Sequence, residues 1–141
     1  MSEKHIKLDS LLTLTRKAFD ERMVGDEARE SCITAAKVLC NSVRSALGPK
    51  GLYKMLSEEH RPLVITKDGF SIITGLIVEH PAARLIAELA KAQDEEVGDG
   101  TTSTVILAGE LLSKAENLLD LGLHPVMVVE GYWEAARKSL E

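Results

Sequence analysis

QDEEVGDGTTS, residues 93–103, decides how the second half of the chain is organised. It joins two runs, residues 82–97 and 101–121, in which apolar side chains recur at helical spacing. Pro81 is suited to the first helical position of the earlier run. Gly-Asp-Gly at 98–100 interrupts the helical pattern, because glycine readily leaves helical backbone angles. The stretch therefore predicts two long helices joined by a short polar turn.

The same turn is a candidate site for an anion. A helix that begins near Thr101 directs unpaired backbone N–H groups out of its N-terminus, where the helix dipole also attracts negative charge. Gly98 and Gly100 would let a ligand approach the backbone closely, and Asp99 is a hard oxygen ligand of the kind that Mg²⁺ takes. Hydroxyl groups that can bond phosphate oxygens follow at Thr101, Thr102 and Ser103.

A simpler interpretation is that Asp99 or Thr101 only caps the helix, since Asp-Gly before a helix is common. The residues of the turn alone leave these two interpretations evenly balanced. Two familiar phosphate motifs do not apply. The sequence contains no G-x-x-x-x-G-K-[ST] loop, and G-x-G-x-x-G fails because position 103 is Ser and a helix precedes the turn.

A third long helix is predicted from Glu27. Its apolar stripe consists of Cys32, Ala36, Leu39, Val43 and Ala46. The sequence LGPKG (47–51) ends this helix, since Gly48 suits a left-handed conformation and Pro49 cannot continue the helix. Cys32 and Cys40 match neither a CxxC motif nor a disulfide framework, so they are expected to be buried thiols in a reducing cytosol.

Short strand-like runs follow at 53–56 (YKML) and 63–66 (LVIT), and they predict a hairpin. KDG (67–69) reads as a turn in which Gly69 would take a positive φ. The next run, FSIITGLIV, could be helix or strand. Pro125 begins a last helix, whose pattern is still helical at Glu141. His80 and His124 each precede a proline at the start of a helix.

The composition narrows the class of protein. Apolar residues make up 45% of the 141 residues and aromatic residues 4%, which suits a helical core of Leu, Ile, Val and Ala. A net charge of −5 without a basic stripe disfavours nucleic acid as a partner. No run approaches the roughly 18 apolar residues of a membrane span. The four histidines lack ligand spacing, so a zinc site is not expected.

Three stretches, in this order and at this spacing, resemble the N-terminal part of a group II chaperonin subunit, as in the archaeal thermosome and the eukaryotic cytosolic ring chaperonin. They are RSALGPKGLYKML (44–56), ITKDG (65–69) followed by VEHPAA (78–83), and QDEEVGDGTTS. HPAA and QDEEVGDGTT favour group II over the bacterial group I relatives. The resemblance runs from about residue 27 to the end of the chain.

The resemblance implies a mainly α fold, a bundle of long helices with a small β-hairpin. Residues 27–141 would be a partial equatorial domain running towards the intermediate domain, and residues 1–26 an N-terminal arm or tail. It further implies ATP and Mg²⁺ as cofactors and a cytoplasmic location. The implied partners are the other chaperonin subunits of a ring oligomer and unfolded protein substrates.

Site roles are carried over from the family's motifs. The residues implied to line the nucleotide are Leu47, Gly48 and Pro49. Those implied to hold its phosphates are Gly100, Thr101, Thr102 and Ser103. Asp99 would bind Mg²⁺, and Asp68 would act catalytically by helping to position the attacking water.

A complete subunit of this family is several times longer. The intermediate-domain aspartate that acts on the water, and the apical surface that binds substrate, have no counterpart in these 141 residues. ATP turnover by this chain alone is therefore expected to be close to background. The alternative function is a truncated, non-hydrolysing helical module for interaction or assembly that retains the chaperonin fold.

Overall fold

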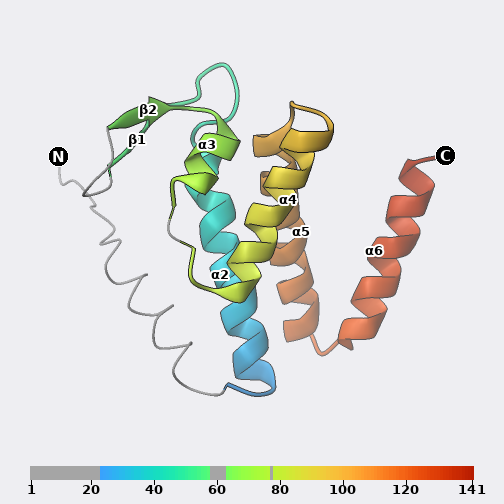
Figure 1. Cartoon of the computed structure of the whole chain (residues 1–141). Helices are drawn as coiled ribbons and strands as arrows, with labels where there is room; N and C mark the ends of the chain where they lie inside the picture. Colours follow the sequence, from blue (N-terminus) through green and yellow to red (C-terminus); the bar gives the residue numbers. More distant parts are fainter. Residues whose placement is uncertain (1–22, 58–62, 77) are drawn as a thin grey trace.

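The computed structural model describes residues 23–57, 63–76 and 78–141, and it confirms a mainly helical fold with one small hairpin (Figure 1). The predicted arm at 1–26 lies almost wholly outside the described residues. The elements are α2 (Asp26–Arg44), β1 (Lys54–Leu56), β2 (Val64–Thr66), α3 (Gly69–Thr74), α4 (Pro81–Glu96), α5 (Thr101–Asp120) and α6 (Pro125–Ser139).

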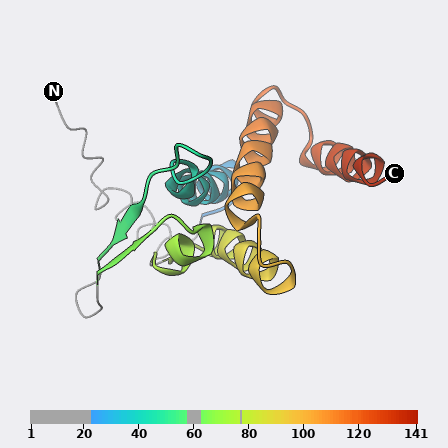
Figure 2. The same cartoon turned by 90° about the horizontal axis from the view of Figure 1, so that it is seen from above.

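Helices α2, α4 and α5 form the bundle, and α3 covers one end of it (Figures 1 and 2). The largest fully buried side chains are Cys40, Val43, Ile72, Ile73 and Val105. Small residues bring the helices close together. A Cβ on Gly109 of α5 would lie 2.5 Å from the Cβ of Cys40 on α2, so only glycine fits at this crossing.

His-Pro pairs begin two of the helices, as the sequence indicated. The ring Nδ1 of His80 accepts the Ala82 N–H at 3.2 Å, which caps α4. The ring Nδ1 of His124 accepts the Val126 N–H at 3.3 Å and caps α6 in the same way. Each proline follows directly, at a helical position where its missing N–H costs nothing.

Helices α2 and α5 each end a few residues before a glycine of positive φ. After α2 the chain turns at Gly48, which has a φ of 85°, and the Leu52 N–H donates to the Ser45 carbonyl at 2.8 Å. After α5 the Gly122 and Leu123 N–H groups donate back to the carbonyls of Leu119 and Leu118, the pairing of a Schellman motif.

The predicted hairpin is present. Strands β1 and β2 pair antiparallel, with Lys54 opposite Thr66, Met55 opposite Ile65 and Leu56 opposite Val64. The run that could have been helix or strand begins as helix α3. The expectation of a positive φ at Gly69 is wrong, because this residue is the first of α3 and Asp68 is its N-cap.

Two further expectations are corrected. Cys40 is buried but Cys32 is exposed. The buried face of α2 runs through Ile33, Ala36, Cys40 and Val43, and Cys32 lies one residue, about 100° of helix rotation, away from that line. Helix α6 ends at Ser139, with Leu140 as its C-cap, and does not continue to Glu141.

Helix α6 stands apart from the bundle (Figure 2). Within α6, all of which the structure describes, Val128 alone is buried. The Tyr132 hydroxyl donates to the Leu111 carbonyl of α5 at 2.6 Å. Trp133 remains 74% exposed. The contact between α6 and α5 is therefore narrow.

Candidate functional site

Three predicted site segments lie at one end of the bundle (Figure 1). They are the turn after α2, the turn between β2 and α3, and the turn between α4 and α5. Because α2 runs towards this end, α4 also runs towards it and α5 runs away from it, residues distant in sequence are gathered there. The roles that the resemblance implies for these residues require them to lie near one ligand, and the contacts described next bring them together.

The β2–α3 turn is joined to the start of α5 by a close contact. A Cβ on Gly69 would lie 2.2 Å from Thr102 Oγ1 and 3.0 Å from Thr102 Cα. No other residue type fits there without movement of the backbone, so glycine is required by packing rather than by its φ. The contact places Asp68, the preceding residue, beside the first turn of α5.

The N-terminus of α5 carries no side-chain cap. Gly100 is the N-cap residue, in left-handed conformation with φ 77° and ψ 5°. Asp99 Oδ1 accepts the N–H of Gly100 at 2.7 Å, outside the helix. The interpretation that Asp99 or Thr101 caps the helix is therefore wrong. The first N–H groups of α5 keep the capacity to bind an anion.

The backbone of this turn is open to a ligand. Gly98 has a φ of 74°, and a Cβ on it would meet only the Asp94 carbonyl, at 3.9 Å. A Cβ on Gly100 would meet only Gln93 Nε2, at 3.7 Å, and one on Gly48 would meet nothing within 4 Å. An exposed carboxylate at Asp99 completes a donor set that suits a phosphate with a magnesium ion.

The three hydroxyl residues are not equally accessible. The side chain of Thr101 is buried, that of Thr102 is half-buried against α3, and that of Ser103 is exposed. Thr101 can therefore reach a ligand mainly through its backbone N–H. The predicted nucleotide-lining residues Leu47, Gly48 and Pro49 are all exposed, in the turn after α2.

Asp68 has a structural task as well as a candidate catalytic one. Its Oδ2 accepts the Ser71 N–H at 2.7 Å and so caps α3. Its own N–H donates to Thr66 Oγ1 at 3.1 Å. The hydrogen bond from Ser71 holds the pKa of the Asp68 carboxyl below its ordinary value. Asp68 is therefore an ionised acceptor at neutral pH, fixed at the start of α3.

Gln93 was not among the predicted site residues, but it contacts the site. Its side-chain Nε2 donates to the Asp99 carbonyl at 2.8 Å. Its main-chain carbonyl accepts the N–H groups of Val97 and Gly98 at 3.1 and 3.3 Å. The one available sequence signal was that Gln93 is the only glutamine in the chain. Glutamine before a turn is not typical of any one structural role, so its presence did not mark Gln93 as a site residue.

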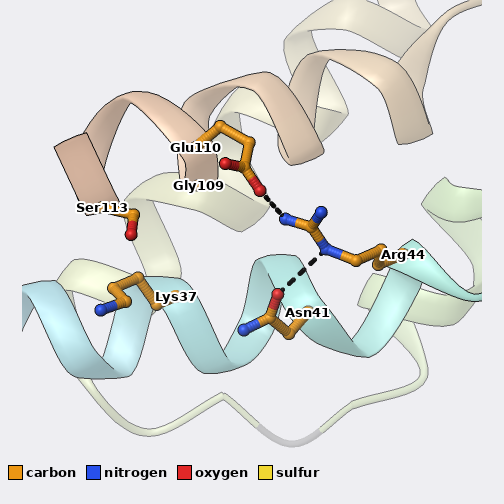
Figure 3. Close-up of a pocket in the computed structure, with 6 residues that line it drawn as sticks. All are labelled: Lys37, Asn41, Arg44, Gly109, Glu110 and Ser113. Carbon is orange, nitrogen blue, oxygen red and sulfur yellow. Dashed lines mark hydrogen bonds and ion pairs between the residues drawn. The ribbon is translucent and has the colours of Figure 1, made fainter.

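Two hollows in the described residues lie away from this end. One, of about 60 Å³, lies between α2 and α5 and is lined by Lys37, Asn41, Arg44, Gly109, Glu110 and Ser113 (Figure 3). Arg44 bridges it, donating to Asn41 Oδ1 at 3.2 Å and to the Glu110 carboxylate. The other, of about 210 Å³, lies between the start of α2 and the end of α5.

Neither hollow contains a predicted nucleotide-binding residue. Both are smaller than the roughly 300 Å³ at which ligand pockets begin. In the described part of the chain there is also no group of three or more His, Cys, Asp or Glu side chains placed to hold a metal. No helix there is long and apolar enough to cross a bilayer. The open turn at 98–103 remains the candidate site.

Comparison with known proteins assigns the family. Residues 39–141 match the TCP-1/cpn60 chaperonin family, and the chain belongs to that family. The chain is 54% identical over 121 residues to thermosome subunit beta of Archaeoglobus fulgidus, covering 86% of this chain and 22% of that protein. It is 52% identical over 128 residues to thermosome subunit alpha of the same organism, covering 91% of this chain and 24% of that protein.

A solved structure agrees with the fold. It is described as a group III chaperonin in the open state, and it matches with a TM-score of 0.76 at 41% sequence identity, over 80% of this chain and 23% of that one. Together these relatives confirm an N-terminal equatorial segment of the group II chaperonin type. The chain spans less than a quarter of the length of these relatives.

Proposed function

We propose that this chain is the ATP-binding part of a group II chaperonin, which assists protein folding through ATP binding and hydrolysis. One observation carries the proposal most directly. The N-terminus of α5 is uncapped and follows two left-handed glycines, and the Asp68-Gly69 turn is packed against it. Family membership supports the same function, because ATP-driven folding is a general property of chaperonins.

The proposed roles follow the geometry. Thr101 and Thr102 offer backbone N–H groups at the positive end of α5, where phosphate oxygens would bind. Gly100, without a side chain, lets a phosphate approach the backbone closely, and Ser103 adds an exposed hydroxyl. Leu47, Gly48 and Pro49 would border the nucleotide from the turn after α2. Asp99 would hold Mg²⁺, which when bound neutralises phosphate charge and polarises the bond that breaks. Asp68 would accept a hydrogen bond from water and orient it.

Binding of ATP by the 141-residue chain tests the proposal. Titration calorimetry in MgCl₂ should show weak binding for wild type, since most of the pocket-forming length of the relatives is not in this chain. Asp99→Ala should weaken binding about tenfold or more, the loss of one good charged contact. Asp120→Ala, an exposed carboxylate at the far end of α5, is the matched control. Equal affinities for wild type and Asp99→Ala would refute the site.

Ring assembly with other chaperonin subunits, unfolded proteins as substrates and a cytoplasmic location belong to the same proposal. Each is a property of the whole subunit rather than of the turn at 98–103. Size-exclusion chromatography of the chain with a full-length thermosome subunit would test assembly. Incorporation of the chain into rings is the expected result, and its permanent exclusion from them would contradict the proposal.

The second candidate is a non-hydrolysing interaction or assembly module. Its supporting observation is the exposed apolar surface of α6, made by Val126, Met127, Val129 and Trp133. The discriminating measurement is phosphate release by the purified chain. Sustained release that Asp68→Ala abolishes would exclude this candidate. Release at background is expected from the chain alone under either candidate, so sustained release is the outcome that discriminates between them.

A further inference from the structure

The turn between α4 and α5 is organised around one side chain that the proposed function does not use. Gln93 lies on the last turn and a half of α4. Its side-chain Nε2 donates to the Asp99 carbonyl at 2.8 Å. Its main-chain carbonyl accepts the N–H groups of Val97 and Gly98, as the carbonyl of any residue at this position would. The side-chain bond reaches six residues ahead, across the turn.

This bond constrains the groups proposed to meet the ligand. The Asp99 carbonyl belongs to the peptide unit whose N–H is that of Gly100. The Gly100 N–H in turn donates to Asp99 Oδ1 at 2.7 Å. Fixing the carbonyl therefore fixes the plane of this peptide, and the Gly100 N–H in the same plane holds the Asp99 carboxylate through its hydrogen bond.

The same amide lies beside the open face of Gly100. It is 3.7 Å from the position that a Cβ on Gly100 would occupy, and it is the nearest atom to that position. The turn has little other support. Gly98 and Gly100 both have positive φ, and glycine is the residue with the most freedom to leave a given conformation. Without the Gln93 bond, few contacts would hold the turn in this one shape.

We infer that Gln93 is a positioning residue for the magnesium and phosphate site: its amide orients the Asp99-Gly100 peptide so that the Asp99 carboxylate and the open N-terminus of α5 face one ligand together. Gln93 itself does not touch the ligand. The ligand class, a nucleotide phosphate with a divalent cation, rests on the proposed function, whereas the orientation of the turn does not.

The first test needs no ligand. Gln93→Met keeps the length and helix propensity of the side chain but removes the N–H donor. Ala92→Met, at the adjacent exposed position, is the control for a methionine near the end of α4. Amide hydrogen exchange of Gly98 and Gly100, followed by NMR, should accelerate roughly five- to tenfold in Gln93→Met, the effect of one lost hydrogen bond. The unfolding midpoint should match that of Ala92→Met.

The second test separates positioning from general stability. ATP binding is measured by calorimetry with MgCl₂ and with EDTA. Gln93→Met should weaken binding in MgCl₂ about fivefold or more and leave the metal-free affinity close to wild type, since the disturbed group is the metal-binding carboxylate. A variant that only loosened the fold would weaken both affinities equally.

The outcomes are distinguishable. Unchanged exchange at Gly98 and Gly100 would refute the positioning role, whatever the nucleotide does. Faster exchange with unaltered magnesium-dependent binding would refute the link between the turn and the ligand. If wild type bound no ATP at all, the proposed function would fail, and faster exchange in Gln93→Met would still establish that Gln93 orients the turn.

Discussion

Gly69 of α3 lies against Thr102 of α5 so closely that a Cβ on Gly69 would be 2.2 Å from the threonine hydroxyl oxygen. This contact fixes the distance between the two turns that carry Asp68 and Asp99. It also explains why a glycine occupies the first position of a helix, where most residues would stabilise the helix better.

Replacing Gly69 tests the contact. Gly69→Ala should lower the free energy of unfolding by about 1–3 kcal/mol, because the added methyl group overpacks the α3–α5 contact. Chemical denaturation measures the change. Thr102→Ala removes the hydroxyl oxygen that is nearest, so the double variant should recover part of the loss.

Gly131 of α6 provides the control for that experiment. It is also a helical glycine, but a Cβ there would meet nothing within 4 Å. Gly131→Ala should therefore stabilise the protein, or at least α6, by about 0.5–1 kcal/mol through lower backbone entropy. Destabilisation by both substitutions to the same extent would contradict the packing explanation.

At Gly109 two helices again approach each other closely, and the neighbouring side chain has less freedom to move aside than at Gly69. A Cβ on it would lie 2.5 Å from Cys40 Cβ and 2.9 Å from Cys40 Sγ. Rotation of the cysteine side chain moves the sulfur but not the Cβ, so relief requires α2 and α5 to separate. Gly109→Ala should cost about 3 kcal/mol, the upper part of the range for overpacking. Thermal unfolding would show this, and an unchanged midpoint would contradict the crossing geometry.

His80 should make stability depend on pH. Burial lowers the pKa of His80 from its ordinary 6.5. The neutral ring is required, because Nδ1 accepts the Ala82 N–H while Nε2 lies 3.4 Å from Ser31 Oγ of α2. The unfolded chain therefore binds a proton more readily than the folded chain. The stabilisation is complete above pH 6.5 and is lost as the pH falls from there towards the lower folded pKa.

Urea unfolding between about pH 5 and pH 7.5 measures this contribution. His80→Asn keeps a capping oxygen but does not titrate, so it should flatten the fall in stability on the acid side. A slope that persists in His80→Asn would show that another group causes it.

The two tasks of Asp68 can be separated by substitution. Asp68→Ala removes the cap of α3 and should cost about 1 kcal/mol, whereas Asp68→Ser retains a capping oxygen and should cost less. In a full-length subunit carrying these changes, ATP hydrolysis should fall in both, since neither provides a carboxylate to orient water. If Asp68→Ser instead hydrolysed ATP at close to the wild-type rate while Asp68→Ala did not, the loss of activity would follow the loss of stability. Asp68 would then act only as the cap of α3.

The sequence correctly predicts those features of the fold that depend on residues close together in the chain. The helices α2, α4 and α5 follow from apolar periodicity. The end of α2 follows from LGPKG, and the starts of α4 and α6 follow from the His-Pro pairs. Features that depend on distant neighbours were missed. Gly69 was assigned a positive φ because its partner, Thr102, is 33 positions away. Cys32 was placed in the core because a stripe of apolar residues does not show where the neighbouring helices stop covering it.

The same division between local and distant features applies to the candidate site. The types of residues 98–103 predict a phosphate site, since glycines, an acid and hydroxyls stand before a helix, and this stays a prediction. The uncapped state of that helix could not be read from the residues, because Asp99 and Thr101 are both good caps elsewhere. The bond from Gln93 to Asp99 could not be read either, since it depends on how sharply the chain bends at Gly98.

The narrow attachment of α6 has a consequence for cooperativity. With Val128 as its one buried residue and Tyr132 bonded to Leu111, α6 draws little of its stability from the bundle, so it should behave as a separate folding unit. Its amides should exchange through local opening, while those of α2 and α5 exchange through global unfolding. The end of the bundle that carries the turn at 98–103 can thus keep its shape while α6 opens and closes.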